Sequence, residues 1–434
     1  MKNLTGSPDI ATKDGRMAIW VATREYNSRP YKGREFFYLL RADAQRLRQF
    51  GWYREDREAR PNGQDFSILF SEKRVKGMKR VYNFNAGPSA MPMEVLKQVQ
   101  QEFLDFAGTG MSIVEISHRS AAYQDMQDDT VATLRRLLRV PAGYHVVFMQ
   151  GGGSMQFLMH GANFLKQRGG YINTGVWSTK AMQAAAFFGE VYEVATSGDK
   201  NFSYIPQSDT FVIKPDTDYV YITSNNTIHG TEWKKFPKFN IPVICDMSSD
   251  FLARPVDVSH FDLIYAGVQK NLGPAGVVTA IIKDSFLETA RTDIPVMLQY
   301  KTFTEHDSTY NTPPVFCIYF VNKVLHWLEN QGGLEKMKGR NAHKAKIVYK
   351  TIDDSAGFYQ GHAAMDSRSN MNVTFNLRTP ELENKFLIEA DAAGFIGIKG
   401  HRSIGGCRAS LYNAVTEEAC AALSEFMRNF QKNN

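Results

Sequence analysis

The chain has 434 residues, of which 43% are apolar, and a formal net charge of +6 at pH 7. A chain of this size can bury a large core, and we expect two domains or one large domain with an appendage. No stretch reaches the roughly 18 apolar residues of a membrane span, and the N-terminus lacks the apolar centre of a signal peptide. The sequence therefore argues against a membrane protein.

The four cysteines stand far apart, and no two of them form a C-x-x-C pair. They are Cys245, Cys317, Cys407 and Cys420. This spacing indicates neither a disulfide framework nor a zinc site. We therefore expect no metal and a reducing, cytoplasmic compartment.

The positive charge is concentrated in the first 80 residues, which hold 18 of the 51 basic and 10 of the 45 acidic side chains. The remainder holds 33 basic and 35 acidic side chains and is nearly neutral. In segment 1–78 arginines alternate with aromatic residues, and 34–50 fits a helix. One interpretation is an arm for nucleic acid or a partner. We favour an extension outside the main fold, with Met78 as a natural start, because no nucleic-acid motif accompanies it.

From residue 81 onward, short apolar runs alternate with helical stretches. The candidate strands are 144–149, 170–173, 191–194, 219–223, 242–245, 263–266 and 277–282. Apolar strands separated by helices are typical of a mostly parallel sheet with both faces covered. The sequence therefore predicts an α/β fold.

After about Gly332 the pattern changes to a long helix with many lysines, followed by separate strands and helices over 371–430. We expect a large domain over 79–340 and a smaller α/β C-terminal domain over 341–434. The first residues of the large domain are expected to pack with the small one.

A lysine stands directly after one of the predicted buried strands. The run FDLIYAGVQKNLGPAG, 261–276, leads from apolar residues through Gln269 to Lys270 and then into a loop with glycine and proline. A lysine at the end of a buried strand is costly unless it has a partner or takes part in chemistry. Burial would lower its pKa and make the amine a nucleophile. Lys270 is therefore a candidate catalytic residue, although a lysine in a surface turn would look similar.

An acidic residue and a glycine-rich turn also follow predicted strands, as Lys270 does. Asp246 ends the predicted strand 242–245, where parallel sheets bind ligands and where a carboxylate can hold a protonated ring nitrogen. Strand 144–149 leads into Gly151, Gly152 and Gly153 and then a helix, which suits an anion such as a phosphate. This turn matches neither the nucleotide P-loop nor the spacing G-x-G-x-x-G.

Together these motifs resemble the phosphoserine aminotransferase family, a class V, fold-type I group of enzymes that use pyridoxal phosphate (PLP). The resemblance covers the chain from about residue 79 to its end. The matching segments, in the family's order, are NAGPSAMP at 85–92, ISHRS at 116–120, QGGGSMQF at 150–157, CDMSS at 245–249, YAGVQKNLGPAG at 265–276, YNTPP at 310–314 and KGHRSIGGCRASLYNA at 399–414. The resemblance implies a PLP-binding large domain.

The resemblance implies a role for each matching residue. Lys270 would hold PLP covalently and shuttle a proton, Asp246 would hold the ring nitrogen, and Trp177 would stack on the ring. The remaining cofactor contacts would come from Gly153, Ser154, Gln269 and Thr227, with Asn311 and Thr312 supplied by the neighbouring subunit of a homodimer. Arg408 would bind the substrate α-carboxylate. The distal anion of the substrate would meet His118 and Arg119, joined by His401 and Arg402 from the other subunit.

The implied reaction is amino transfer between L-glutamate and 3-phosphohydroxypyruvate, which gives O-phospho-L-serine and 2-oxoglutarate in serine biosynthesis. The phosphorylated hydroxy-keto acid of pyridoxine biosynthesis is left open as a second substrate. Alanine–glyoxylate transamination and cysteine desulfuration are the alternatives within class V. The first has little use for so many cationic groups, and the second needs a mobile cysteine, whereas Cys407 lies inside the Arg408 motif.

Overall fold

A seven-stranded sheet organises the larger part of the computed structural model, which describes residues 80–434. The basic segment 1–78 and its predicted helix lie outside the described residues. Six strands run in the same direction, and β10 is antiparallel to both of its neighbours. In spatial order the strands are β2 (Tyr144–Gly151), β10 (Gly276–Lys283), β9 (Leu263–Gly267), β8 (Val243–Asp246), β5 (Thr217–Thr223), β3 (Arg168–Asn173) and β4 (Glu190–Thr196).

All seven strands fall on apolar runs that the sequence predicts as strands, so the mostly parallel sheet is confirmed. The strands are apolar without alternation because both faces of the sheet are covered. In β2, Val146 and Phe148 belong to the core on one face, while Val147 and Met149 belong to the core on the other. This is the two-residue period of a strand whose faces are both buried.

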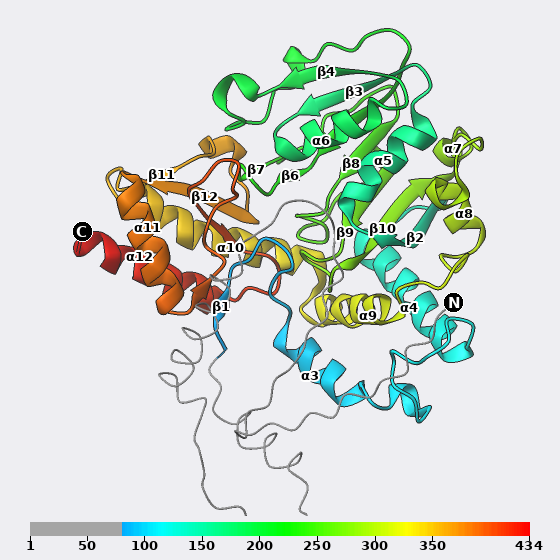
Figure 1. The fold of residues 1–434 in the computed structure, drawn as a ribbon, viewed down its shortest axis with the longest axis horizontal. Coiled ribbons are helices and arrows are strands. Elements are labelled where there is room, and N and C mark those ends of the chain that lie inside the picture. Colours follow the sequence, from blue (N-terminus) through cyan, green and yellow to red (C-terminus); the bar gives the residue numbers. More distant parts are fainter. Residues whose placement is uncertain (1–79) are drawn as a thin grey trace, which may run out of the picture. The chain divides into compact units, whose positions relative to one another are not determined.

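Two groups of helices cover the two faces (Figure 1). On one face lie α3 (Met93–Glu102), α4 (Ala121–Leu138) and α9 (Val315–Asn330). On the other lie α5 (Gly153–Phe164), α6 (Val176–Ala185), α7 (Asp284–Leu287) and α8 (Tyr300–Glu305). A short hairpin, β6 (Asn225–Asn226) with β7 (Thr231–Glu232), follows β5.

A second, three-stranded antiparallel sheet forms the C-terminal part with its own core. It consists of β11 (Tyr359–Gly361), β12 (Asn372–Leu377) and β14 (Cys407–Ser410), packed with α10 (Gly333–Asp353), α11 (Pro380–Ala392) and α12 (Glu417–Lys432). The N-terminal strand β1 (Tyr82–Asn83) pairs with β13 (Phe395–Ile396), and Phe84 joins this core. Helix α10 runs through the predicted boundary between residues 340 and 341 and contacts both α9 and α12.

Side-chain caps explain where several helices begin. The hydroxyl of Ser120 accepts a hydrogen bond from the amide of Tyr123 at the start of α4, and Thr416 does the same at the start of α12. Such a cap satisfies an amide that would otherwise lack a partner in the helix. By contrast, no side chain caps α5 or α6, the two helices that begin nearest the candidate site.

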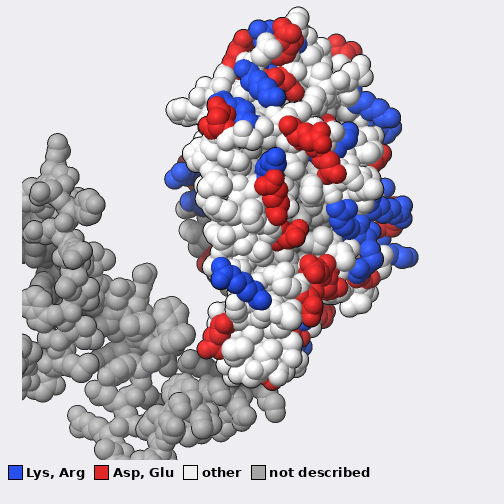
Figure 2. Space-filling model, turned by 90° about the vertical axis from the view of Figure 1, so that its right-hand side faces the viewer, with Lys and Arg blue, Asp and Glu red and all other residues white. Residues whose placement is uncertain are grey.

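Charged side chains of both signs are found on the face of the described part that Figure 2 shows. On the face in Figure 2, Lys and Arg side chains are interspersed with Asp and Glu. This agrees with the nearly equal numbers of basic and acidic side chains after residue 80. None of the helices in residues 80–434 is long and apolar enough to cross a membrane.

Candidate active site

A cavity of about 280 Å³ opens where the carboxyl ends of several parallel strands meet. Ligands of open α/β sheets bind at this edge, and the volume is near the lower end of small-molecule pockets, roughly 300–1,000 Å³. The lining consists of Ala86, Gly87, Gly153, Ser154, Phe157, Trp177, Thr227, Asp246, Ser248, Gln269, Lys270, His401 and Arg408. Nine of these residues were predicted from the sequence as site residues.

Lys270 follows the end of β9 and projects its amine into this cavity. Its Nζ donates a hydrogen bond of 2.7 Å to the hydroxyl of Thr227 and lies 5.8 Å from the centre of the Trp177 ring. Burial lowers the pKa of Lys270 to about 8, Asp246 opposes the shift, and the cation of Arg408 adds to it. A lysine with a lowered pKa supplies more of the neutral amine that attacks carbonyl groups.

Asp246 is the last residue of β8 and has a side chain that is almost fully buried. Burial raises the pKa of its carboxyl group, while the cation of Lys270 and hydrogen bonds from Ser248 oppose the rise. The amide of Ser248 donates to one carboxylate oxygen at 2.8 Å. A desolvated carboxylate gains strongly from a cationic partner, so this acid suits a protonated ring nitrogen.

The glycine turn after β2 leads into α5 without a side-chain cap, so the first amides of the helix remain available to an anion. A side chain on Gly153 would be crowded, because an added Cβ would lie 3.2 Å from the hydroxyl oxygen of Ser248. That hydroxyl accepts a hydrogen bond of 3.0 Å from the amide of Gly267, just before Gln269. The close packing of these three segments forms a polar end of the cavity that suits a phosphate.

Trp177 forms a flat apolar wall. It lies in the first turn of α6, after Gly175, whose φ of +149° favours glycine. An added Cβ on Gly175 would come within 2.3 Å of the Asn226 side chain, so the turn requires glycine. The Trp177 ring lies 6.5 Å from the Phe157 ring, and its indole N–H is buried with no hydrogen-bond partner among the described residues.

Arg408 enters the cavity from β14 of the second sheet. Its Nη1 donates to the carbonyl of Thr227 at 3.5 Å, and its Nε has no partner within residues 80–434. No carboxylate of the described residues lies within 4.0 Å of this guanidinium, and burial lowers its pKa. A half-buried guanidinium without an acid beside it is suited to bind a carboxylate ligand.

His401 lines the cavity of its own chain, and its supply to the site of the other subunit stays a prediction. Its ring lies 6.4 Å from that of Trp177. His401 belongs to a tight backbone loop, in which the amide of Gly400 donates to the carbonyl of Gly406 at 2.8 Å. Arg402, next to it, is exposed.

The remaining predicted residues lie outside this cavity. Asn311 and Thr312 are exposed, and the Gln150 side chain donates to the Asn311 side chain at 3.1 Å and to the Thr312 carbonyl at 2.8 Å. His118 and Arg119 lie in the loop before α4 and do not line the cavity. Their roles in substrate or cofactor binding stay predictions.

Ser248 was not predicted from the sequence, although its amide and hydroxyl join Asp246 to the glycine turn. The available signal was its place two residues after Asp246, where an Asp side chain often accepts from the backbone. Lys180 was also missed. Its Nζ lies 5.0 Å from the centre of the Trp177 ring, and its charge helps to lower the pKa of His401 after burial, Arg408 and Arg402.

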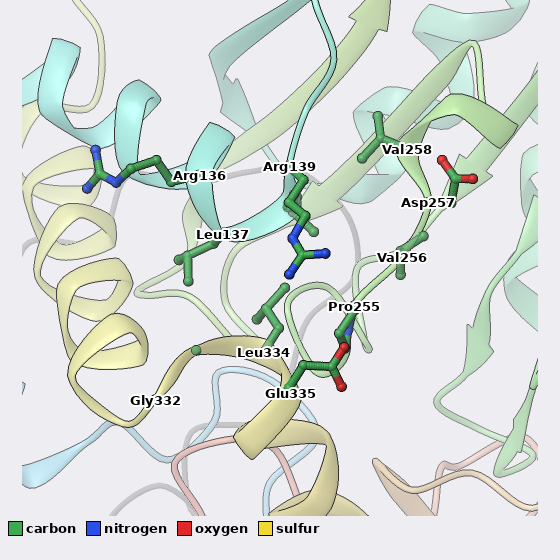
Figure 3. Close-up of a pocket in the computed structure, with 12 residues that line it drawn as sticks. Arg136, Leu137, Arg139, Pro255, Val256, Asp257, Val258, Gly332, Leu334 and Glu335 are labelled. Carbon is green, nitrogen blue, oxygen red and sulfur yellow. The ribbon is translucent and has the colours of Figure 1, made fainter.

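A larger cavity of about 510 Å³ lies elsewhere, between the end of α4, residues 255–258 and the start of α10 (Figure 3). Arg139 points toward Leu334 and Glu335 at the start of α10, whereas Arg136 points away and pairs with Glu329. None of the residues predicted to carry chemistry lines this cavity. The cavity around Lys270 is therefore the candidate active site.

Comparison with known proteins places the chain in a family. The family model described as "Aminotransferase class-V" matches residues 81–423. The phosphoserine aminotransferase of Lysinibacillus sphaericus is 51% identical over 357 residues, which are 82% of this chain and 99% of that protein. The enzyme of Bacillus subtilis is 50% identical over 359 residues, 82% of this chain and 100% of that protein.

Solved structures agree. A phosphoserine aminotransferase whose structure shows radiation damage of the Schiff base has a TM-score of 0.81 and is 49% identical. The match covers 82% of this chain and all of that one. The enzyme of Bacillus circulans subsp. alkalophilus has a TM-score of 0.80 and 47% identity, covering 82% and 99%. The PLP-bound enzyme of Trichomonas vaginalis has a TM-score of 0.77 and 36% identity, covering 80% and 100%. The chain therefore belongs to the phosphoserine aminotransferase family of class-V, PLP-dependent aminotransferases.

Proposed function

We propose that this chain transfers the amino group between L-glutamate and 3-phosphohydroxypyruvate, producing 2-oxoglutarate and O-phospho-L-serine. The observation that carries the proposal is the amine of Lys270, with a pKa lowered to about 8. It shares a cavity with the buried carboxylate of Asp246 and with the guanidinium of Arg408, which has no acidic partner within residues 80–434. The family and its named relatives supply the substrate class.

The residues of the cavity fit PLP. Its aldehyde would meet the amine of Lys270, its ring nitrogen the carboxylate of Asp246, and one face of its ring the indole of Trp177. The phosphate would bind the polar end of the cavity at Gly153, Ser154 and Gln269. When bound, PLP supplies the electron sink that stabilises negative charge at the substrate Cα.

The chain itself positions the substrate and moves protons. Arg408 would hold the α-carboxylate in a bidentate pair, which fixes the direction of the Cα–H bond. Lys270 Nζ would take the proton from Cα as a general base, held in place by the Thr227 hydroxyl. The aromatic wall of Trp177 and Phe157 would keep water from the reacting atoms.

The distal anion of the substrate, a phosphate or a γ-carboxylate, would lie near His401 and Arg402. The charges of Arg408, Arg402 and Lys180 contribute to the lowered pKa of His401, so this side of the cavity is cationic. Each of the two anionic groups on one substrate would thus meet a cationic side chain. His118 and Arg119 would complete the distal site from the neighbouring subunit.

We further propose a homodimer that acts on small molecules in the cytoplasm. Asn311 and Thr312 are exposed and outside their own chain's cavity, as expected for residues that reach a neighbour's cofactor phosphate. The four cysteines are free, as in a reducing compartment. Desulfuration is disfavoured, because Cys407 is buried and burial raises its pKa well above the ordinary value.

A coupled assay tests this function directly. The purified PLP-loaded protein is given 2-oxoglutarate with phosphoserine, alanine or cysteine as the amino donor, and glutamate formation is followed. We expect phosphoserine to be preferred by orders of magnitude in kcat/KM. Equal or better turnover of alanine, or sulfide release from cysteine, would refute the proposed substrate. The phosphorylated hydroxy-keto acid of pyridoxine biosynthesis is tested as an acceptor in the reverse direction.

A further inference from the structure

A buried lysine on α10 has no part in the reaction described above. Lys344 is 2% exposed, and its Nζ donates three hydrogen bonds to backbone carbonyls, to Leu411 at 2.9 Å, Tyr412 at 2.8 Å and Val415 at 3.0 Å. No carboxylate of the described residues lies within 4.0 Å of it. A buried cation bound only by carbonyl dipoles is uncommon, because burial of a charge is costly.

The ammonium is the form present at neutral pH. Burial lowers the pKa of Lys344 to about 8, with Arg340 adding to the shift and Cys420 and Glu417 opposing it. Below this pKa the group carries three N–H donors, and all three are used. Three carbonyl groups of the 411–415 turn therefore bind the same nitrogen atom, Nζ of Lys344.

This turn is the direct continuation of the strand that carries Arg408. Strand β14 ends at Ser410 and α12 begins at Glu417, so the turn lies in the stretch of chain that connects them. The hydroxyl of Tyr412 donates to the carbonyl of Ala86 at 2.9 Å, and Ala86 lines the active-site cavity. A shift of the turn would thus move both Arg408 and a wall of the cavity.

The same turn is fixed to the segment that carries Lys270. The amide of Asn413 donates to the side chain of Asn271, the residue after Lys270, at 3.0 Å. The Asn413 side chain donates to the carbonyl of Leu252 at 3.0 Å and accepts from Asn341 at 2.8 Å. These asparagines are buried, so each hydrogen bond is shielded from water.

Helix α10 supplies both anchors, Asn341 and Lys344, which lie three residues apart and therefore on one face of the helix. This helix runs between the two sheets (Figure 1). Lys270 follows a strand of the seven-stranded sheet and Arg408 lies in the second sheet, so their separation depends on how the two sheets are connected. The 411–415 turn, which Lys344 binds, is one of the segments that connect the two sheets.

We propose that Lys344 is a positioning residue, which fixes Arg408 relative to Lys270 by holding the 411–415 turn and so sets the affinity of the site for the substrate α-carboxylate. The role of Arg408 comes from the proposed function, on which this inference rests. A merely structural lysine would change how much protein folds. A positioning lysine also changes the affinity of the folded site.

The test compares Lys344→Met with Lys346→Met. Methionine matches the length of lysine but has no donor, and Lys346 is exposed two residues further along the same helix. Each PLP-loaded variant is titrated with 2-oxoglutarate in the absence of an amino donor, and Kd is measured by calorimetry. The visible absorption and PLP content of each variant are measured first, because they report an intact cofactor site.

We expect Lys344→Met to raise the Kd for 2-oxoglutarate about tenfold or more, within the range that a misplacement of about 1 Å produces. The KM for phosphoserine should rise in parallel, with a smaller change in kcat, while Lys346→Met equals the parent. A folded, PLP-loaded Lys344→Met protein with the parent Kd overturns the proposal.

Lys344→Gln decides the matter if Lys344→Met does not fold. Glutamine keeps a polar amide but cannot supply the three N–H groups that the carbonyls of Leu411, Tyr412 and Val415 receive. It should also raise Kd, and an unchanged Kd in this folded variant would overturn the proposal. The parent protein could bind 2-oxoglutarate and yet not act on phosphoserine. This result would refute the proposed substrate, but the comparison of Kd values would still test the role of Lys344.

Discussion

Arg408 and Lys270 reach the same cavity from different sheets, and both contact Thr227. The amine of Lys270 donates to its hydroxyl at 2.7 Å, and the guanidinium of Arg408 donates to its carbonyl at 3.5 Å. One residue thus sets the positions of the proposed nucleophile and the proposed carboxylate clamp. This arrangement suits the proposed α-amino acid substrate, whose amino group and carboxylate are bonded to the same carbon atom.

Replacement of Arg408 by lysine should weaken binding of every amino-acid substrate. Lysine keeps the charge but loses the planar fork that binds a carboxylate in bidentate fashion. A charge-assisted hydrogen bond is worth about 1.5–3 kcal/mol, so kcat/KM should fall about 10- to 100-fold for both glutamate and phosphoserine. The matched variant Arg402→Lys should change kcat/KM for glutamate and phosphoserine by different factors. Arg402 is proposed to bind the distal group, and this is the group in which the two substrates differ. Equal effects of the two variants would argue against these assignments.

The rate at which PLP reconstitutes the cofactor-free enzyme should depend on pH through Lys270. The neutral amine is the reactive form, so the rate should rise with pH and level off above about 8, the lowered pKa of this lysine. An unperturbed lysine would give a rise centred near 10.4. Stopped-flow absorbance at a series of pH values measures the midpoint. A midpoint close to 10 would mean that burial does not activate Lys270.

Much of the fold follows from local sequence pattern, but the arrangement around the cavity does not. Apolar runs predict the seven strands because both faces of the sheet are buried, and the positions of Asp246 and Lys270 follow from the strand ends. The loop that carries His401 is closed by the Gly400–Gly406 hydrogen bond, a contact that spacing does not reveal. Helix α10 also carries exposed lysines at 346 and 350, so the sequence does not reveal that Lys344 is buried.

Mixed dimers can show which chain supplies His401. If His401 serves its own chain, a hybrid of Lys270→Ala and His401→Ala subunits contains no intact site and stays inactive. If Thr312 serves the neighbour, a hybrid of Lys270→Ala and Thr312→Ala subunits contains one intact site, and activity should return to about half of the parent dimer per dimer. Recovery in the first hybrid would place His401 in the partner's site instead.

Removal of residues 1–78 should leave transamination unchanged. Among the residues that the structure describes, those that line the cavity all lie at position 86 or beyond. The truncated and full-length proteins are compared by kcat/KM for phosphoserine and by thermal unfolding. The same pair tests the alternative role of the basic segment, because salt-sensitive binding of nucleic acid should be absent from both. A large loss of activity on truncation would mean that the segment contributes to the catalytic fold.

The most direct measurement identifies the residue that PLP labels. The PLP-loaded protein is treated with borohydride, which makes the lysine–cofactor bond permanent, and is then digested and analysed by mass spectrometry. We predict that the label is on the peptide containing Lys270 and is absent from Lys270→Ala, whereas Lys346→Ala is labelled like the parent. Label on another lysine, or transamination by Lys270→Ala at the parent rate, would contradict the account.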